Sequence, residues 1–212
     1  MAAKRCSLST VNRPLRFPLS MPRFIAFLRA INVGGHTVKM QALREHFETL
    51  GFNAVETFIA SGNVLFDART KDAATLERRI ERHLHEALGY EVATFLRTPA
   101  ELAATALHPA FPASGAGEPG YPLYIAFTRT LVRDEAERTL LGLRTDIDDF
   151  HVNGREIYWA CRSSISQSPF TGGRLEKIIG MPATMRNVTT VRKLAVMVDP
   201  RTPGSPPTTA AS

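Results

Sequence analysis

The stretch AVETFIASGNVLF, Ala54 to Phe66, contains two short apolar runs joined by Ser61-Gly62-Asn63. Small and polar residues between two apolar runs are typical of a hairpin turn, so we expect two antiparallel strands here. A hairpin in the middle of a chain of alternating strands and helices excludes a simple all-parallel sheet. What lies on either side of the hairpin therefore decides the fold.

Both flanks of the hairpin repeat a strand and a helix. FIAFLRAI at 24–31 is one apolar run, and EVATFLR at 91–97 is another. Between these runs and the hairpin, apolar residues recur at helical spacing in two segments, which predicts two helices. The first segment contains Met40, Leu43, Phe47 and Leu50 and is followed by Gly51. The second contains Leu76, Ile80, Leu84 and Leu88 and is followed by Gly89. The order β-α-β-β-α-β is that of the ferredoxin-like, or split βαβ, arrangement.

The second half of the chain partly repeats this order. Thr98 to Glu101 is a capping box with proline at the first helical position, which predicts a third helix. After the Pro- and Gly-rich linker 108–120, YPLYIAF predicts a strand, residues 136–141 a helix, and Asn153-Gly154 a tight hairpin. Helices are expected over 175–179 and over 188–198. We therefore expect an α+β fold of two ferredoxin-like (αβ-plait) subdomains, 21–107 and 121–198, the second partial or modified.

Composition limits the classes of protein that fit. Apolar residues make up 44% and charged residues 22%, which is typical of a globular protein. The apolar runs are too short to span a bilayer, and two cysteines, Cys6 and Cys161, fit a reducing cytoplasm. The net charge of +6 favours anionic partners. Residues 1–20 are basic and acid-free, and we expect a disordered extension or an over-long start before Met21, with a transit peptide as the alternative. The low-complexity tail 199–212 is expected to be disordered.

The motifs RAINVGGHTVKM, SGNVLF and ATMRNVTTVRKL occur in this order along the chain. Together they resemble the bacterial family catalogued as domain of unknown function 1697, over roughly Pro22 to Val198. The resemblance implies two ferredoxin-like subdomains, in agreement with the element order. It implies no established activity.

The motif RAINVGGH suggests where function could lie. In a split βαβ unit the first two strands are parallel, so the loop after the first strand and the hairpin after the second meet at one edge of the sheet. This places Arg29, Asn32, Ser61, Gly62 and Asn63 together, and the loop adds Gly34, Gly35 and Lys39 near the first helix. Backbone N–H groups beside glycines and an arginine can bind an anion. The alternative is that the glycines serve the turn while Asn and Ser cap it.

A second cluster opens the last helix. Arg186 and Asn187 lie there with Thr184, Thr190 and Lys193. Asn187 fits a helix cap, whereas Arg186 suits either an anionic ligand or a structural salt bridge between the subdomains, which we prefer. We count Arg186 and Asn187 among the candidate ligand-binding residues.

Other kinds of site are disfavoured. The six histidines show no metal-ligand spacing, so we expect no metal and no cofactor. Both strands FIAFLRAI and YPLYIAF are apolar on both faces, so an open base-stacking sheet of the RRM kind is not expected. The leading hypothesis is a soluble cytoplasmic protein that binds an anionic small molecule or nucleic acid, and not a membrane. The alternatives are an enzyme acting on a phosphorylated or carboxylated small molecule, and a structural or dimerisation module.

Overall fold

The computed structural model describes residues 21–32, 35–111, 121–163 and 167–199. Four predictions lie wholly or mostly outside these ranges: the disordered segment 1–20, Gly34, the linker 108–120 beyond residue 111, and the tail from residue 200 onward. No helix within the described ranges is both long enough and apolar enough to cross a membrane.

The first half has the predicted β-α-β-β-α-β order followed by the predicted third helix. Its elements are β1 (Arg23–Leu28), α1 (Met40–Thr49), β2 (Asn53–Phe58), β3 (Asn63–Asp67), α2 (Ala73–Leu88), β4 (Thr94–Arg97) and α3 (Pro99–Leu107). The sheet order is β2-β3-β1-β4, with every neighbouring pair antiparallel. Helix α3 begins at the predicted capping box, in which Thr98 accepts from the Glu101 backbone and Glu101 accepts from the Thr98 backbone. The ferredoxin-like prediction is confirmed for this half.

The second half is also ferredoxin-like, as expected, and it is complete rather than partial. It contains β5 (Leu123–Phe127), α4 (Asp134–Leu141), β6 (Asp148–Asn153), β7 (Glu156–Cys161), α5 (Gly172–Ile179), β8 (Thr184–Asn187) and α6 (Val188–Val198). The sheet order β6-β7-β5-β8 is the same as in the first half. The additional element is β8, whose residues the sequence places at the start of the last helix. Each half therefore has the order βαββαβα.

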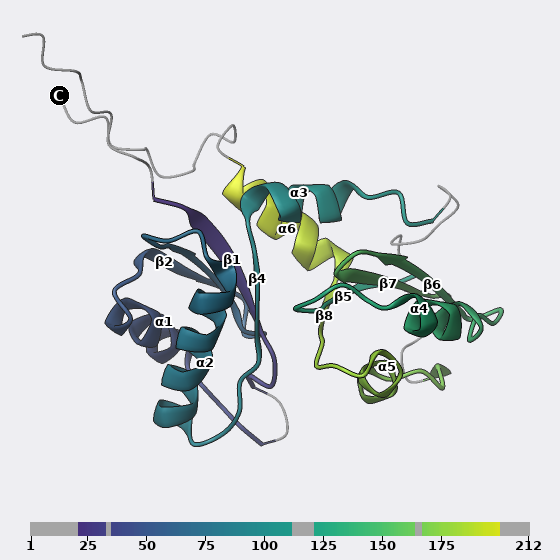
Figure 1. Cartoon of the computed structure of the whole chain (residues 1–212), viewed down its shortest axis with the longest axis horizontal. Helices are drawn as coiled ribbons and strands as arrows, with labels where there is room; N and C mark the ends of the chain where they lie inside the picture. Colours follow the sequence, from purple (N-terminus) through teal and green to yellow (C-terminus); the bar gives the residue numbers. More distant parts are fainter. Residues whose placement is uncertain (1–20, 33–34, 112–120, 164–166, 200–212) are drawn as a thin grey trace, which may run out of the picture.

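Three apolar clusters stack through the molecule. The first lies between β1–β4 and helices α1 and α2, and the third lies between the second sheet and helices α4 and α5. The second cluster joins the inner faces of both sheets to α3 and α6. Figure 1 shows α3 and α6 between the two halves, with the other helices on the outer sides. Both faces of both sheets are thus covered, as predicted, and the two halves share one central core.

Residues of β1 alternate between two of these clusters. Phe24, Ala26 and Leu28 enter the outer cluster, whereas Ile25 and Phe27 enter the central one. The ring of Phe27 stacks on the ring of Phe127 from β5, with ring centroids 4.1 Å apart. Phe127 holds in the second half the place that Phe27 holds in the first, so the equivalent strands β1 and β5 meet at the centre of the molecule.

Candidate functional site

Arg186 of β8 reaches from the second half into the first. The side chain is buried, and all three of its nitrogens donate hydrogen bonds. Its Nη2 donates to the backbone oxygens of Leu28 at 2.9 Å and Ser61 at 2.7 Å, and its Nε donates to Asn63 Oδ1 at 2.6 Å. Its Nη2 also donates to Gly62 O at 3.3 Å, and its Nη1 donates to Thr184 and Met185 beside it. Arg186 therefore holds the end of β1 and the β2–β3 turn against β8.

Among the residues that the structure describes, no carboxylate pairs with Arg186, which connects the halves through carbonyl oxygens and not through the predicted salt bridge. Burial lowers the pKa of the Arg186 guanidinium to about 10. The group thus stays charged at neutral pH. Carbonyl dipoles converging on it supply the solvation that water would otherwise give.

Arg97 of β4 is the counterpart of Arg186 in the first half. Ile25 of β1 pairs with Arg97, as Ile125 of β5 pairs with Arg186. Arg97 Nη2 donates across to the backbone oxygens of Thr128 at 3.0 Å and Arg155 at 3.2 Å, and its Nε donates to Glu156 at 2.6 Å. The contacts of the two buried arginines are therefore reciprocal, which identifies them as the connectors of the two subdomains.

A second reciprocal pair lies just beyond the ends of β1 and β5. Arg29 donates through Nε and Nη2 to both carboxylate oxygens of Glu176 in α5, at 2.7 and 2.9 Å. Arg129, from the other half, contacts two carboxylates of α2: its Nε lies 3.3 Å from Glu77, and its Nη2 contacts Glu81. Both arginine side chains are 43% exposed. Arg29 therefore has a structural partner and a solvent-facing surface at once.

The loop after β1 differs from its counterpart after β5 in backbone conformation. Ala30 has a φ of 66° and Asn32 a φ of 57°, in the left-handed region that L-residues seldom adopt. Asn32 braces this loop, because its side chain donates to Ala60 O at 2.9 Å and accepts from Val38 N at 2.6 Å. The loop and the β2–β3 turn are thus neighbours, as predicted. In the described part of the chain, no residue of the turn 129–132 has a positive φ.

Gly62 allows the turn to approach this loop closely. Its φ is 71°, and a Cβ atom there would lie 3.0 Å from Ile31 Cβ and 3.1 Å from Leu28 Cβ. A side chain at this position would push the turn away from the loop. The glycine is therefore required by contact as well as by conformation.

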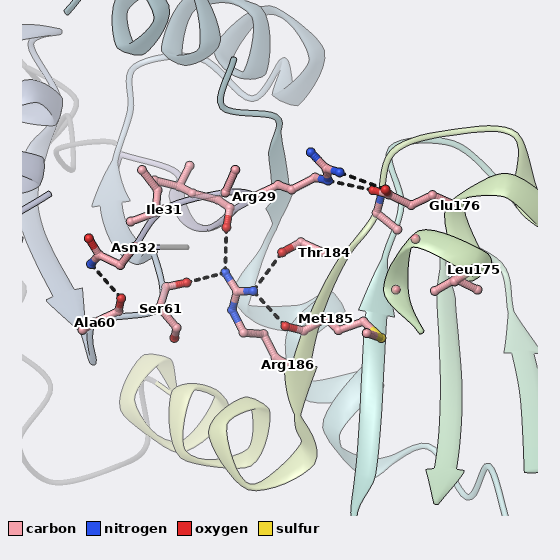
Figure 2. Close-up of a pocket in the computed structure, with 15 residues that line it drawn as sticks. Arg29, Ile31, Asn32, Ala60, Ser61, Leu175, Glu176, Thr184, Met185 and Arg186 are labelled. Atoms are coloured by element: carbon pink, nitrogen blue, oxygen red, sulfur yellow. Dashed lines mark hydrogen bonds and ion pairs between the residues drawn. The ribbon is translucent and has the colours of Figure 1, made fainter. Parts of the chain in front are cut away.

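These segments border a cleft of about 580 Å³ between the two halves. One wall consists of residues 28–32 and the Ala60–Ser61 turn, and the other of β8 and the first turns of α5, including Gly172, Gly173 and Glu176. Figure 2 shows Arg29 reaching across the cleft to Glu176, and Arg186 pointing to the opposite wall. The volume is within the range of small-molecule sites.

The structure brings together some of the predicted ligand-binding residues and separates others. Arg29, Asn32, Ser61 and Arg186 line the cleft. Gly62 and Asn63 accept hydrogen bonds from Arg186 but do not line the cleft. Asn187 caps α6 and does not line it either. Gly35 and Lys39 do not line it; Lys39 precedes α1 and makes no side-chain cap bond.

On the wall from the second half, the sequence indicates Arg186 but not Glu176. Glu176 lies 147 residues from Arg29 along the chain, and its helix was recognised only by the apolar residues around it. Its carboxylate also accepts from Ala183 N at 2.8 Å, which fixes it beside β8. Only the three-dimensional repeat reveals the pairing, because Arg29 contacts Glu176 where Arg129 contacts Glu77 and Glu81 in the other half.

Comparisons with known proteins agree with this architecture. Residues 21–158 match a family model described as "Protein of unknown function (DUF1697)". A solved structure of the conserved bacterial protein SP0830 from Streptococcus pneumoniae is similar, with a TM-score of 0.63 and 23% sequence identity. The similarity covers 83% of this chain and 97% of that one. None of the curated proteins matches the chain.

Proposed function

Since this chain belongs to the DUF1697 family of proteins of unknown function, we propose its function from the geometry of the cleft: it binds a small molecule that carries a phosphate or carboxylate group. Arg29 is the group that recognises the anion. Its Nε and Nη2 bond to Glu176, while its Nη1 has no hydrogen-bond partner within the described residues. A half-exposed guanidinium with a free donor is suited to an anionic oxygen.

The single observation that carries this proposal is the strained backbone of the cleft wall. A left-handed conformation costs an ordinary L-residue about 1–2 kcal/mol, and Ala30 adopts it. Asn32 adopts it too, as asparagine does more readily than other L-residues. The second half connects β5 to α4 by a shorter turn without positive φ. The strain is thus peculiar to the longer loop at the cleft, and strained backbone at a cleft is a reason to infer function.

The contacts of the cleft support binding more than catalysis. Glu176 is the carboxylate among the lining residues, and it accepts bonds from Arg29 and from Ala183 N. A carboxylate held in this way is poorly placed to take a proton from a substrate. An anion that reaches Arg29 must instead compete with Glu176.

The proposal is tested by thermal shift on the full chain with phosphate, ATP, citrate and a short single-stranded RNA. A compound present at about 100 times its Kd should raise Tm by about 5–10 °C. Nucleic-acid binding would weaken steeply as sodium chloride is raised, whereas a single-anion site would respond much less.

Arg129→Ala is the matched control for Arg29→Ala. Each change removes an arginine of equal exposure that forms an ion pair between the halves. We expect Arg29→Ala to lose the ligand response, Arg129→Ala to keep it, and Glu176→Gln to strengthen it by removing the competitor. The proposal is wrong if none of the compounds raises Tm, or if Arg29→Ala responds as the parent does.

A further inference from the structure

Helix α6 has a second face that the core does not use. Its buried residues Val188, Val191, Leu194 and Val198 enter the central cluster. On the opposite side, residues three or four apart form a stripe of Thr189, Arg192, Lys193, Val196 and Met197. This stripe and Phe58 of β2 line a groove of about 510 Å³, which shares no lining residue with the cleft.

One end of the groove is apolar. Val196 is 58% exposed and Met197 is 37% exposed, while Phe58 packs partly against the central cluster. Apolar side chains gathered in a surface groove are typical of sites that bind another molecule. Methionine adapts its shape to different apolar partners, which suits such a site.

The other end is cationic. Arg192 and Lys193 are exposed, and neither forms an ion pair with any carboxylate among the residues that the structure describes. Within the described ranges, no acidic side chain lines the groove. The complement of this surface is therefore a molecule with one large apolar group and carboxylates a helical turn away.

We propose that the α6 groove binds an acidic peptide segment of a partner protein. A large apolar side chain of the segment lies against Val196, Met197 and Phe58, and its carboxylates pair with Arg192 and Lys193. An amphipathic segment in a groove of this kind is a common mode of peptide recognition. The ends of this chain do not fit, because residues 1–20 contain Lys4, Arg5, Arg13 and Arg16 but no acid, and residues 200–212 contain no acidic side chain.

A nucleic acid fits the groove less well. Single-stranded sites stack bases on exposed aromatic rings, and Phe58, the aromatic residue of the groove, is half-buried against the core. Two cations also neutralise few phosphates. Charge and shape together therefore favour a peptide.

The test is selection of a phage-displayed library of random peptides against the full chain. Enriched peptides should combine Asp or Glu with a large apolar residue. The double variant Arg192→Glu/Lys193→Glu should retain these phage at least about tenfold less well than the parent. Arg78→Glu/Arg82→Glu, a matched reversal of exposed arginines on α2, should retain them fully. The variant Val196→Ser/Met197→Ser keeps both cations and should also lose retention.

Several results would overturn the proposal. These are no enrichment of any peptide, enriched peptides without acidic residues, or equal phage retention by the parent and by both groove variants when the variants have the Tm of the parent. Sedimentation analysis of the chain alone tests whether a second copy of this chain occupies the groove instead. A concentration-dependent dimer that disappears in the Arg192→Glu/Lys193→Glu variant would mean that a second copy of this chain fills the groove.

Discussion

Ala30 is a residue whose backbone conformation and chemical identity conflict. Its φ of 66° favours glycine, so Ala30→Gly should raise the free energy of unfolding by about 1 kcal/mol, measured in urea. The equivalent change in the second half, Thr130→Gly, has no positive φ to relieve and should lower it by about 1 kcal/mol. Equal destabilisation by both changes would remove the strain argument. A stabilised Ala30→Gly with weaker ligand response would connect the strain to binding.

The hydrogen bonds of Arg186 cannot be formed by a lysine at the same position. A lysine keeps the charge but lacks the planar fork that bonds to Leu28 O, Ser61 O and Asn63 Oδ1. Buried acceptors would lose their donors, so Arg186→Lys should cost about 2–4 kcal/mol of unfolding free energy. Arg97→Lys should cost a similar amount. Arg44→Lys, on the exposed face of α1, should change it by no more than about 0.5 kcal/mol. A tolerated Arg186→Lys would show that the carbonyl network contributes little.

At the scale of elements, the sequence predicts helices and strands that are long or that end at clear turn or capping residues. The first half, the hairpins and the helix over 188–198 follow from apolar spacing and turn residues. Strand β8 does not, because its four residues TMRN lack apolar alternation and Asn187 caps α6 directly. What makes it a strand is its pairing with β5, a contact between distant residues. For the same reason the sequence does not reveal Glu176 as the partner of Arg29, because the two residues are distant along the chain.

Helix α3 depends on a signal that the sequence does show. Thr98→Ala removes the cap that accepts from Glu101 N, and it should lower the unfolding free energy by about 1 kcal/mol in a urea titration. Thr139→Ala is the control, since Thr139 lies inside α4 and its hydroxyl bonds only to the Glu135 carbonyl one turn earlier. That change should be neutral or slightly stabilising. If the two variants are equally stable, the capping box does not stabilise α3.

At the scale of the whole molecule, a protease should cut the chain between the two halves, and the two pieces should remain associated. We expect elastase, which cuts after small residues, to cleave within 108–120 before either half. Because the central cluster contains side chains from both sheets, α3 and α6, the pieces should still co-elute in gel filtration. Separate elution of two folded pieces would mean that the shared core is weak. Early cleavage between Leu76 and Leu88 would contradict the proposed subdomain boundaries.

The shared core also has a consequence during protein synthesis. Ile25, Phe27, Leu65 and Phe95 form the inner face of the first sheet. Helix α3 covers part of that face, and the rest is covered only after β5, β7 and α6 exist. Ribosomes add about 5–20 residues per second, so the stretch from Leu107 to Val198 takes about 5–20 s to make. For that interval the nascent chain carries an apolar sheet face that is covered only in part. The speed of translating the second half therefore sets how long chaperones have to protect the first.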